Sequence, residues 1–152
     1  MNGKEREKVT AIELLAAAKE ARKNAYAPYS GFFVGAALLA ADGEVYGGCN
    51  VESVSFTPTC CAERTALCKA VSEGKREFSA IAVVGGGKDG KTGFCPPCGV
   101  CRQMLSEFCG RDFRVILSSG DGEGEEVKVF TLGELLPEAF GTEKPFGSEK
   151  KK

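Results

Sequence analysis

The chain has 152 residues, of which 43% are hydrophobic and 27% charged, a composition typical of one ordinary globular domain. Its 20 basic and 21 acidic side chains give a net charge of −1, which argues against a nucleic-acid-binding protein, because such proteins usually carry a basic excess. No apolar run approaches the roughly 20 residues that a membrane span needs, and the charged segment 1–8 lacks the apolar core of a signal peptide. We therefore expect a cytoplasmic protein without membrane contact.

The first predicted element is a helix from Thr10 to about Ala25. Thr10 and Glu13 have the spacing of a capping box, which indicates a helix N-terminus. The segment 27–31, with its proline and glycine, ends the helix. The helical period places four residues on one face: Ile12, Leu15, Ala16 and Lys19.

Strands and helices then alternate. Residues 32–41 form a long apolar run with small side chains, typical of a strand buried on both faces. Asp42-Gly43 is a hairpin turn signal, so residues 44–49 are the predicted return strand. The remaining predicted elements are a helix over 61–71, a strand over 79–84 ended by the glycines at 85–87, a helix over 99–108, strands over 113–117 and 126–130, and a short helix opened by a second capping box at Thr131 and Glu134.

This order, α-β-β-α-β-α-β-β-α, predicts an α/β fold with one mixed five-stranded sheet flanked by helices. No repeat or linker divides the chain. We expect one catalytic domain over residues 1–140 and a charged, disordered tail over residues 141–152.

Eight cysteines and no histidine are the unusual feature of the composition. In a reducing compartment, a cysteine cluster indicates a metal site or catalysis rather than disulfides. Cys61 begins one predicted helix, and Cys98 and Cys101 begin another, one helical turn apart, where the helix N-terminus favours a thiolate. Three thiolates on one zinc ion leave its fourth position for water, as in a catalytic site. Glu63 can approach that water without being a ligand.

Two other metal sites are possible on these cysteines. A closed structural zinc site needs a fourth ligand. Cys60 is expected to point away because it adjoins Cys61, whereas Cys95 could reach the metal. The Cys-x-x-Cys-x-x-Cys run over 95–101 imitates part of a ferredoxin motif, but Leu105 stands where the next cysteine is expected. The other three cysteines are expected to be small buried residues: Cys49, Cys68 and Cys109. Cys60 and Cys95 are expected to be partly exposed.

A Cys-x-Glu element followed by Pro-Cys-x-x-Cys resembles the arrangement in zinc deaminases. Nearly the whole chain is similar to the cytidine deaminases, specifically their small, homotetrameric, three-cysteine class. The segments that carry this resemblance are Ala-Pro-Tyr-Ser at 27–30, Val-Gly-Ala-Ala at 34–37, Gly-Cys-Asn-Val-Glu at 48–52, Cys-Ala-Glu-Arg-Thr-Ala at 61–66, Pro-Cys-Gly-Val-Cys-Arg-Gln at 97–103 and Glu-Leu-Leu-Pro at 134–137.

The resemblance implies a cytidine deaminase-like three-layer fold, one Zn²⁺ per chain, a homotetramer, and a free pyrimidine nucleoside as substrate in pyrimidine salvage. It implies these roles: Cys61, Cys98 and Cys101 as zinc ligands, Glu63 as the catalytic acid and base, Phe32 packing on the pyrimidine, Asn50 and Glu52 binding the ribose hydroxyls, Ala62 contacting the substrate, and Arg64 donating hydrogen bonds to the ligand sulfurs. In this hypothesis zinc lowers the pKa of its bound water, Glu63 moves the proton to N3, hydroxide attacks C4, and ammonia leaves.

Three rival functions are weighed against this one. A deaminase of bases within nucleic acid is disfavoured by the net charge. A deaminase of a cytosine-containing nucleoside analogue or antibiotic would share the metal elements, and a non-enzymatic zinc module would not need Glu63. Two departures from the family, Ser53 in place of an asparagine and Phe56 in place of a tyrosine, put the substrate range in question.

Overall fold

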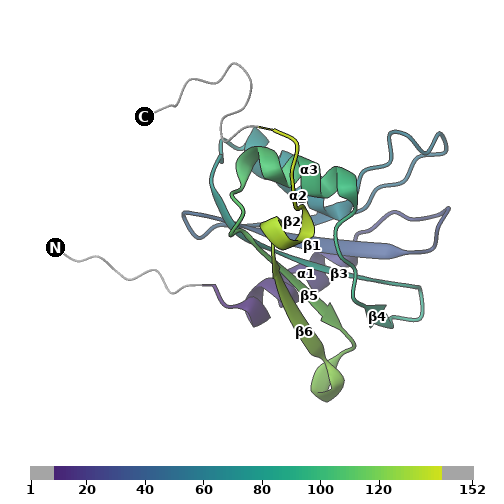
Figure 1. Ribbon diagram of the computed structural model, residues 1–152. Coiled ribbons are helices and arrows are strands. Elements are labelled where there is room, and N and C mark those ends of the chain that lie inside the picture. The colour runs from purple at the N-terminus through teal and green to yellow at the C-terminus, as the bar shows by residue number, and fades with distance from the viewer. Residues whose placement is uncertain (1–8, 142–152) are drawn as a thin grey trace.

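A mixed sheet of six strands, covered by helices on both faces, is formed by residues 9–141, the part of the chain that the computed structural model describes (Figure 1). The strands are β1 (Phe33–Ala40), β2 (Val45–Cys49), β3 (Phe78–Gly86), β4 (Thr92–Gly93), β5 (Arg114–Ser119) and β6 (Glu126–Thr131). The helices are α1 (Ala11–Arg22), α2 (Ala62–Ser72), α3 (Gly99–Phe108) and α4 (Leu132–Leu135), with one 3₁₀ turn at Gly122–Gly124.

The strand order is β2-β1-β3-β5-β6, with β3 and β5 parallel and the other pairs antiparallel. The predicted α/β class and mixed sheet are confirmed. The prediction of five strands missed β4, a two-residue strand that pairs with the end of β3. The glycines at 85 and 86, predicted to end that strand, belong to it, because they pair with Gly93 and Thr92.

The core has two halves, one on each face of the sheet (Figure 1). On one face, side chains of α2 and α3 pack on Leu38, Ile81 and Val115. On the other face, α1 packs on Leu39 and Ile116. Successive residues of β1, β3 and β5 alternate between the two halves, as expected of strands that are buried on both faces.

The predicted face of the first helix is partly wrong. Leu14, Leu15 and Ala18 are the buried residues of α1, whereas Ile12 is 78% exposed and Ala16 is exposed. The close approach of α1 to β1 explains the difference, because a Cβ atom at Gly35 would lie 2.1 Å from the Ala18 carbonyl oxygen. Both predicted capping boxes are present, at Thr10 and at Thr131.

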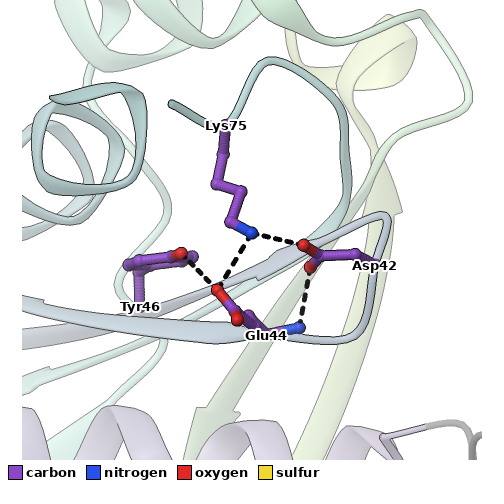
Figure 2. Close-up of polar contacts among 4 residues, drawn as sticks. All are labelled: Asp42, Glu44, Tyr46 and Lys75. Atoms are coloured by element: carbon purple, nitrogen blue, oxygen red, sulfur yellow. Dashed lines mark hydrogen bonds and ion pairs between the residues drawn. The ribbon is translucent and has the colours of Figure 1, made fainter. Parts of the chain in front are cut away.

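A polar cluster fixes the far end of α2 to the β1–β2 hairpin (Figure 2). Lys75, just after α2, contacts the carboxylates of Asp42 and Glu44, with its Nζ 3.0 Å from Glu44 Oε2. The Tyr46 hydroxyl donates to the same Glu44 oxygen at 2.6 Å. These contacts hold the C-terminal end of α2 against the β1–β2 hairpin. The opposite, N-terminal end of α2 begins at Cys61.

The predicted domain boundary near residue 140 stays a prediction, and most of the predicted tail, residues 142–152, lies outside the described residues, as does the charged segment 1–8. Between residues 9 and 141, no helix combines the length and the apolar composition that crossing a membrane requires.

Candidate active site

Three cysteine sulfurs meet where α2 and α3 begin. Cys61 is the N-cap of α2, Cys98 is the N-cap of α3, and Cys101 lies in the first turn of α3. Their Sγ atoms lie within 4.8 Å of one another, and those of Cys61 and Cys98 are 3.8 Å apart. Tetrahedral zinc with Zn–S bonds of about 2.3 Å requires sulfurs about 3.8 Å apart, so this spacing fits a zinc ion.

The cluster has three cysteines and no fourth. Within residues 9–141 these are the only cysteines, histidines or carboxylates grouped closely enough to hold a metal, and Cys95 is not among them. A closed four-cysteine zinc site and a ferredoxin-like site are therefore not supported. An open coordination position is what a catalytic zinc needs.

Positive charge surrounds the sulfurs. The N-terminal ends of α2 and α3 both point at the cluster, and each carries partial positive charge. Arg64 Nη2 donates to Cys61 Sγ at 3.7 Å and to the Thr59 carbonyl oxygen at 3.1 Å. Hydrogen bonding from Cys101, supported by Arg64 and opposed by burial, lowers the pKa of the Cys61 thiol to about 5. Cys61 is thus favoured as a thiolate.

Glu63 lies on the first turn of α2 and is 4% exposed. Burial raises the pKa of this carboxyl, and the neighbouring charge of Cys61 raises it further. A buried carboxyl with a raised pKa can both take up and release a proton near neutral pH, which is what a single acid–base group requires.

A pocket of about 300 Å³ opens beside the cysteines. That volume is at the small end of the usual range for small-molecule sites, about 300–1,000 Å³. Seven of the nine predicted site residues line it: Phe32, Asn50, Glu52, Cys61, Ala62, Glu63 and Cys98. Of the other two, Cys101 is fully buried behind the pocket, and Arg64 lies against Cys61.

Asn50 and Glu52 both face this pocket, but each also holds the chain around it. The Asn50 side chain accepts from the Val34 amide and donates to the Phe32 carbonyl oxygen, both at 2.9 Å. Glu52 Oε1 accepts from the amides of Tyr29 and Ser30 at 3.0 and 3.1 Å. Both side chains retain further hydrogen-bonding capacity for a ligand.

The pKa of Glu52 is lowered by its hydrogen bonds to Ser30, first from the hydroxyl and then from the backbone amide. The carboxylate is therefore ionised near neutral pH, the form in which it accepts hydrogen bonds from hydroxyl groups. Phe32, immediately before β1, is 44% exposed and presents its ring to the pocket rather than to the core.

The cysteines without a predicted role were placed less well. Cys60 and Cys95 are partly exposed, as predicted, but both also line the pocket, which spacing alone did not reveal. Burial raises the pKa of Cys95 to about 11. The prediction that Cys68 is buried is wrong: it is exposed, because it lies on the face of α2 opposite the buried Ala66 and Ala70. Cys49 and Cys109 are partly buried.

The family model described as "Cytidine and deoxycytidylate deaminase zinc-binding region" matches residues 8–117 of the chain. The chain belongs to this family. A cytidine deaminase of Sporosarcina psychrophila is 50% identical over 131 residues, which cover 86% of this chain and 91% of that protein. The crystal structure of a cytidine deaminase from Burkholderia pseudomallei has a TM-score of 0.76 and 49% identity, covering 86% of this chain and 99% of that one.

A less similar relative is named as a deaminase of blasticidin S. The blasticidin-S deaminase of Bacillus cereus is 32% identical over 108 residues, covering 68% of this chain and 74% of that protein. The family match and the three-sulfur geometry together assign zinc as the cofactor of the site.

Proposed function

We propose that the chain catalyses the zinc-dependent hydrolytic deamination of free cytidine and deoxycytidine to uridine and deoxyuridine, with release of ammonia. One observation carries the proposal: the three-sulfur cluster and the buried Glu63 share a 300 Å³ pocket with Phe32, Asn50 and Glu52. The relatives at 40–50% identity that are named cytidine deaminases support the same reaction.

Cys61, Cys98 and Cys101 would hold the zinc ion. When bound there, zinc supplies the Lewis acidity that ionises water near neutral pH. Three thiolates outweigh the charge of one Zn²⁺, so the Arg64 guanidinium and the two helix N-termini restore part of the positive potential.

Glu63 is the proton carrier of the proposed reaction. Its carboxylate accepts a proton from water and delivers it to N3 of the pyrimidine, which makes C4 more electrophilic. The oxygen of that water bonds to C4, and Glu63 then moves the oxygen's remaining proton to the C4 amino group, which leaves as ammonia as the C4–N bond breaks. Water supplies the new oxygen, so cytidine and water give uridine and ammonia. Burial of Glu63 supports the role, because it raises the pKa of the carboxyl above that of an exposed glutamate and so favours uptake of a proton.

The remaining residues orient the nucleoside. Phe32 packs on the pyrimidine ring, the ionised Glu52 accepts hydrogen bonds from the ribose hydroxyls, and the Asn50 amide donates to them or accepts from them. The amide of Ala62, in the first turn of α2, has no acceptor within the helix and is available to the substrate. These groups recognise a free nucleoside without a phosphate, which fits the near-neutral charge of the chain.

The decisive experiment compares the zinc-loaded protein with its Glu63→Gln variant. Loss of the cytidine absorbance band and ammonia release are followed with cytidine, deoxycytidine, cytosine and a cytosine-containing single-stranded oligonucleotide. We expect turnover of the two nucleosides alone. In Glu63→Gln we expect turnover to fall at least about 100-fold, since general acid–base catalysis contributes that much, with about one zinc still bound per chain.

The same assay tests the second candidate. A cytosine-containing nucleoside analogue or antibiotic is the alternative substrate, and blasticidin S is the compound to test because the Bacillus cereus relative is named blasticidin-S deaminase. Turnover of blasticidin S with none of cytidine would replace our proposal by this one. One zinc per chain with no turnover of any compound, or Glu63→Gln as active as the wild type, would refute both.

We further propose that the protein is a cytoplasmic homotetramer that serves pyrimidine salvage. Tyr29 and Phe56 support an oligomer: they are 50% and 70% exposed and pack edge to face, with ring centroids 6.0 Å apart, next to Glu52. Large exposed aromatics beside a pocket are typical of a surface that another chain covers. Sedimentation equilibrium of the zinc-loaded protein tests this, and a monomer would contradict it.

A further inference from the structure

One wall of the pocket lies directly on the backbone of β3. Phe32 and Cys95 both line the pocket, and both contact the place where residue 85 would have a side chain. A Cβ atom at Gly85 would lie 2.8 Å from Cys95 Sγ, 3.1 Å from Cys95 Cβ and 3.0 Å from Phe32 Cε1. Ordinary van der Waals contacts of a Cβ atom are 3.4–4 Å. The ring and the thiol therefore occupy the space that an alanine at position 85 would need.

Two neighbouring glycines show that this requirement is particular to the pocket. At Gly86 a Cβ atom would lie 2.0 Å from the backbone oxygen of Lys91, so the fold itself requires glycine there. At Gly93, the strand partner of Gly85, a Cβ atom would meet nothing within 4 Å. Gly85 has no left-handed backbone conformation to explain it. The three atoms nearest to a Cβ at this position all belong to the two pocket side chains.

Hydrogen bonds fix the backbone at Phe32. A side chain at position 85 would therefore displace the Phe32 ring rather than its backbone. The Phe32 amide donates to Ser30 Oγ at 3.0 Å, and its carbonyl oxygen accepts from Asn50 Nδ2 at 2.9 Å. The next carbonyl, of Phe33, accepts from Arg22 Nε at 2.8 Å. Since the ring and the Cys95 thiol both border the pocket, atoms pushed away from Gly85 narrow it.

We propose that Gly85 is a positioning residue of the nucleoside site, acting through the Phe32 ring and the Cys95 thiol that form this wall of the pocket. Because Gly85 has no side chain, the Phe32 ring and the Cys95 thiol can pack directly on the backbone of β3. Their position there sets the width of the pocket beside the base. The inference rests on the proposed function only in taking the ligand to be a pyrimidine nucleoside.

The test compares Gly85→Ala with Gly93→Ala, which adds the same methyl group to the partner strand. Both are measured zinc-loaded for kcat and KM with cytidine, for uridine binding by calorimetry, and for zinc content and thermal unfolding. Overpacking of a close-packed site predicts that Gly85→Ala raises KM and the uridine Kd about five- to tenfold. We expect kcat to stay within about twofold and zinc content to match Gly93→Ala, because the three atoms nearest to the added methyl group belong to Cys95 and Phe32 and not to Glu63 or the three zinc-ligand cysteines.

Rescue separates positioning from a general structural effect. Cys95 Sγ is the atom nearest to the added methyl group, so Gly85→Ala/Cys95→Ala, compared with Cys95→Ala alone, should recover most of the affinity that Gly85→Ala loses. Should Gly85→Ala fail to fold, Cys95→Leu enlarges the same wall without altering β3 and should raise KM similarly.

Two results would overturn the inference alone, in a protein whose wild type turns over cytidine. The first is that Gly85→Ala, or Cys95→Leu in its place, has the same KM and uridine Kd as Gly93→Ala. The second is that Gly85→Ala/Cys95→Ala recovers none of the lost affinity. A zinc-loaded wild type that neither deaminates cytidine nor binds uridine overturns the proposed function, and the inference with it.

Discussion

Gly48 on β2 allows α2 to lie close enough to the sheet to place Cys61 at the three-sulfur cluster. Replacing Gly48 should therefore lower the affinity for zinc without changing a ligand. A Cβ atom at Gly48 would lie 2.4 Å from the Ala66 amide nitrogen and 2.6 Å from the Ala62 carbonyl oxygen. Both obstacles are helix backbone, which no rotamer change can remove. Ordinary contact begins at 3.4 Å, so Gly48→Ala must move the first turns of α2 about 1 Å away from the sheet.

That movement displaces Cys61, the N-cap of α2, relative to Cys98 and Cys101 on α3. Zinc–sulfur distances tolerate only about 0.2 Å, so a shift of about 1 Å leaves the three sulfurs mismatched to one ion. We expect zinc affinity to fall about 10- to 100-fold, the usual consequence of disturbing the support of a ligand. Overpacking should also cost about 2 kcal/mol and lower the melting temperature by about 4–8 °C.

The assay is competition for zinc against a chromophoric chelator, with thermal unfolding of the same samples. Gly47→Ala is the matched control: it lies next to Gly48 but faces α1, where a Cβ atom would meet only Ala21 Cβ, at 3.3 Å. Zinc affinity of Gly48→Ala within about twofold of the wild type would refute the reasoning, as would an equal loss in Gly47→Ala.

Two further predictions concern charge. Glu52→Gln should raise the KM for cytidine about 10- to 100-fold with little change in kcat, since hydrogen bonds to a charged group are worth about 1.5–3 kcal/mol; unaltered KM, or an equal effect of the exposed Glu20→Gln, would contradict it. Hydrogen bonds from the Tyr46 hydroxyl and then from Lys75 lower the pKa of Glu44. The stabilisation that comes from the ionised Glu44 is therefore present above the unfolded pKa of about 4.3 and is lost as the pH falls through the folded pKa. Hydrogen bonds to the carboxylates of Asp42 and then Glu44 raise the pKa of Lys75. The stabilisation that comes from the charged Lys75 is therefore present below the unfolded pKa of about 10.4 and is lost as the pH rises through the folded pKa. The stability difference between the wild type and Lys75→Met, from urea unfolding, should be largest between about pH 5 and pH 10 and shrink outside that window; a difference independent of pH would refute the assignment.

Local signals in the sequence predicted most of the fold. The capping boxes at Thr10 and Thr131 mark true helix starts, and α3 has the predicted bounds, because these signals depend on neighbouring residues. The buried face of α1 and the length of β3 depend instead on distant contacts. The carbonyl of Ala18 meets Gly35, and Gly85 finds a partner in Gly93, which no periodicity reveals.

The candidate site follows the same division. Cys61, Glu63 and the pair Cys98 and Cys101 could be predicted, because each belongs to a short motif at the start of a helix. Nothing local shows that Cys95 turns back toward Phe32, since that approach depends on the loop that carries β4.

The central position of β3 has a consequence for how the protein acquires its metal. Along the chain, β3 lies between the helix that begins at Cys61 and the helix that begins at Cys98, and in the sheet it lies between β1 and β5. We expect the sulfurs of these two helices to meet once β3 has been inserted between its neighbours, because both helices pack on the sheet that β3 joins. Until then the chain offers the Cys98–Cys101 pair and a remote third thiol, a weak and incomplete chelator. Zinc retention therefore marks the chains in which the sheet has been assembled, and zinc loading measured during refolding reports the insertion of one strand.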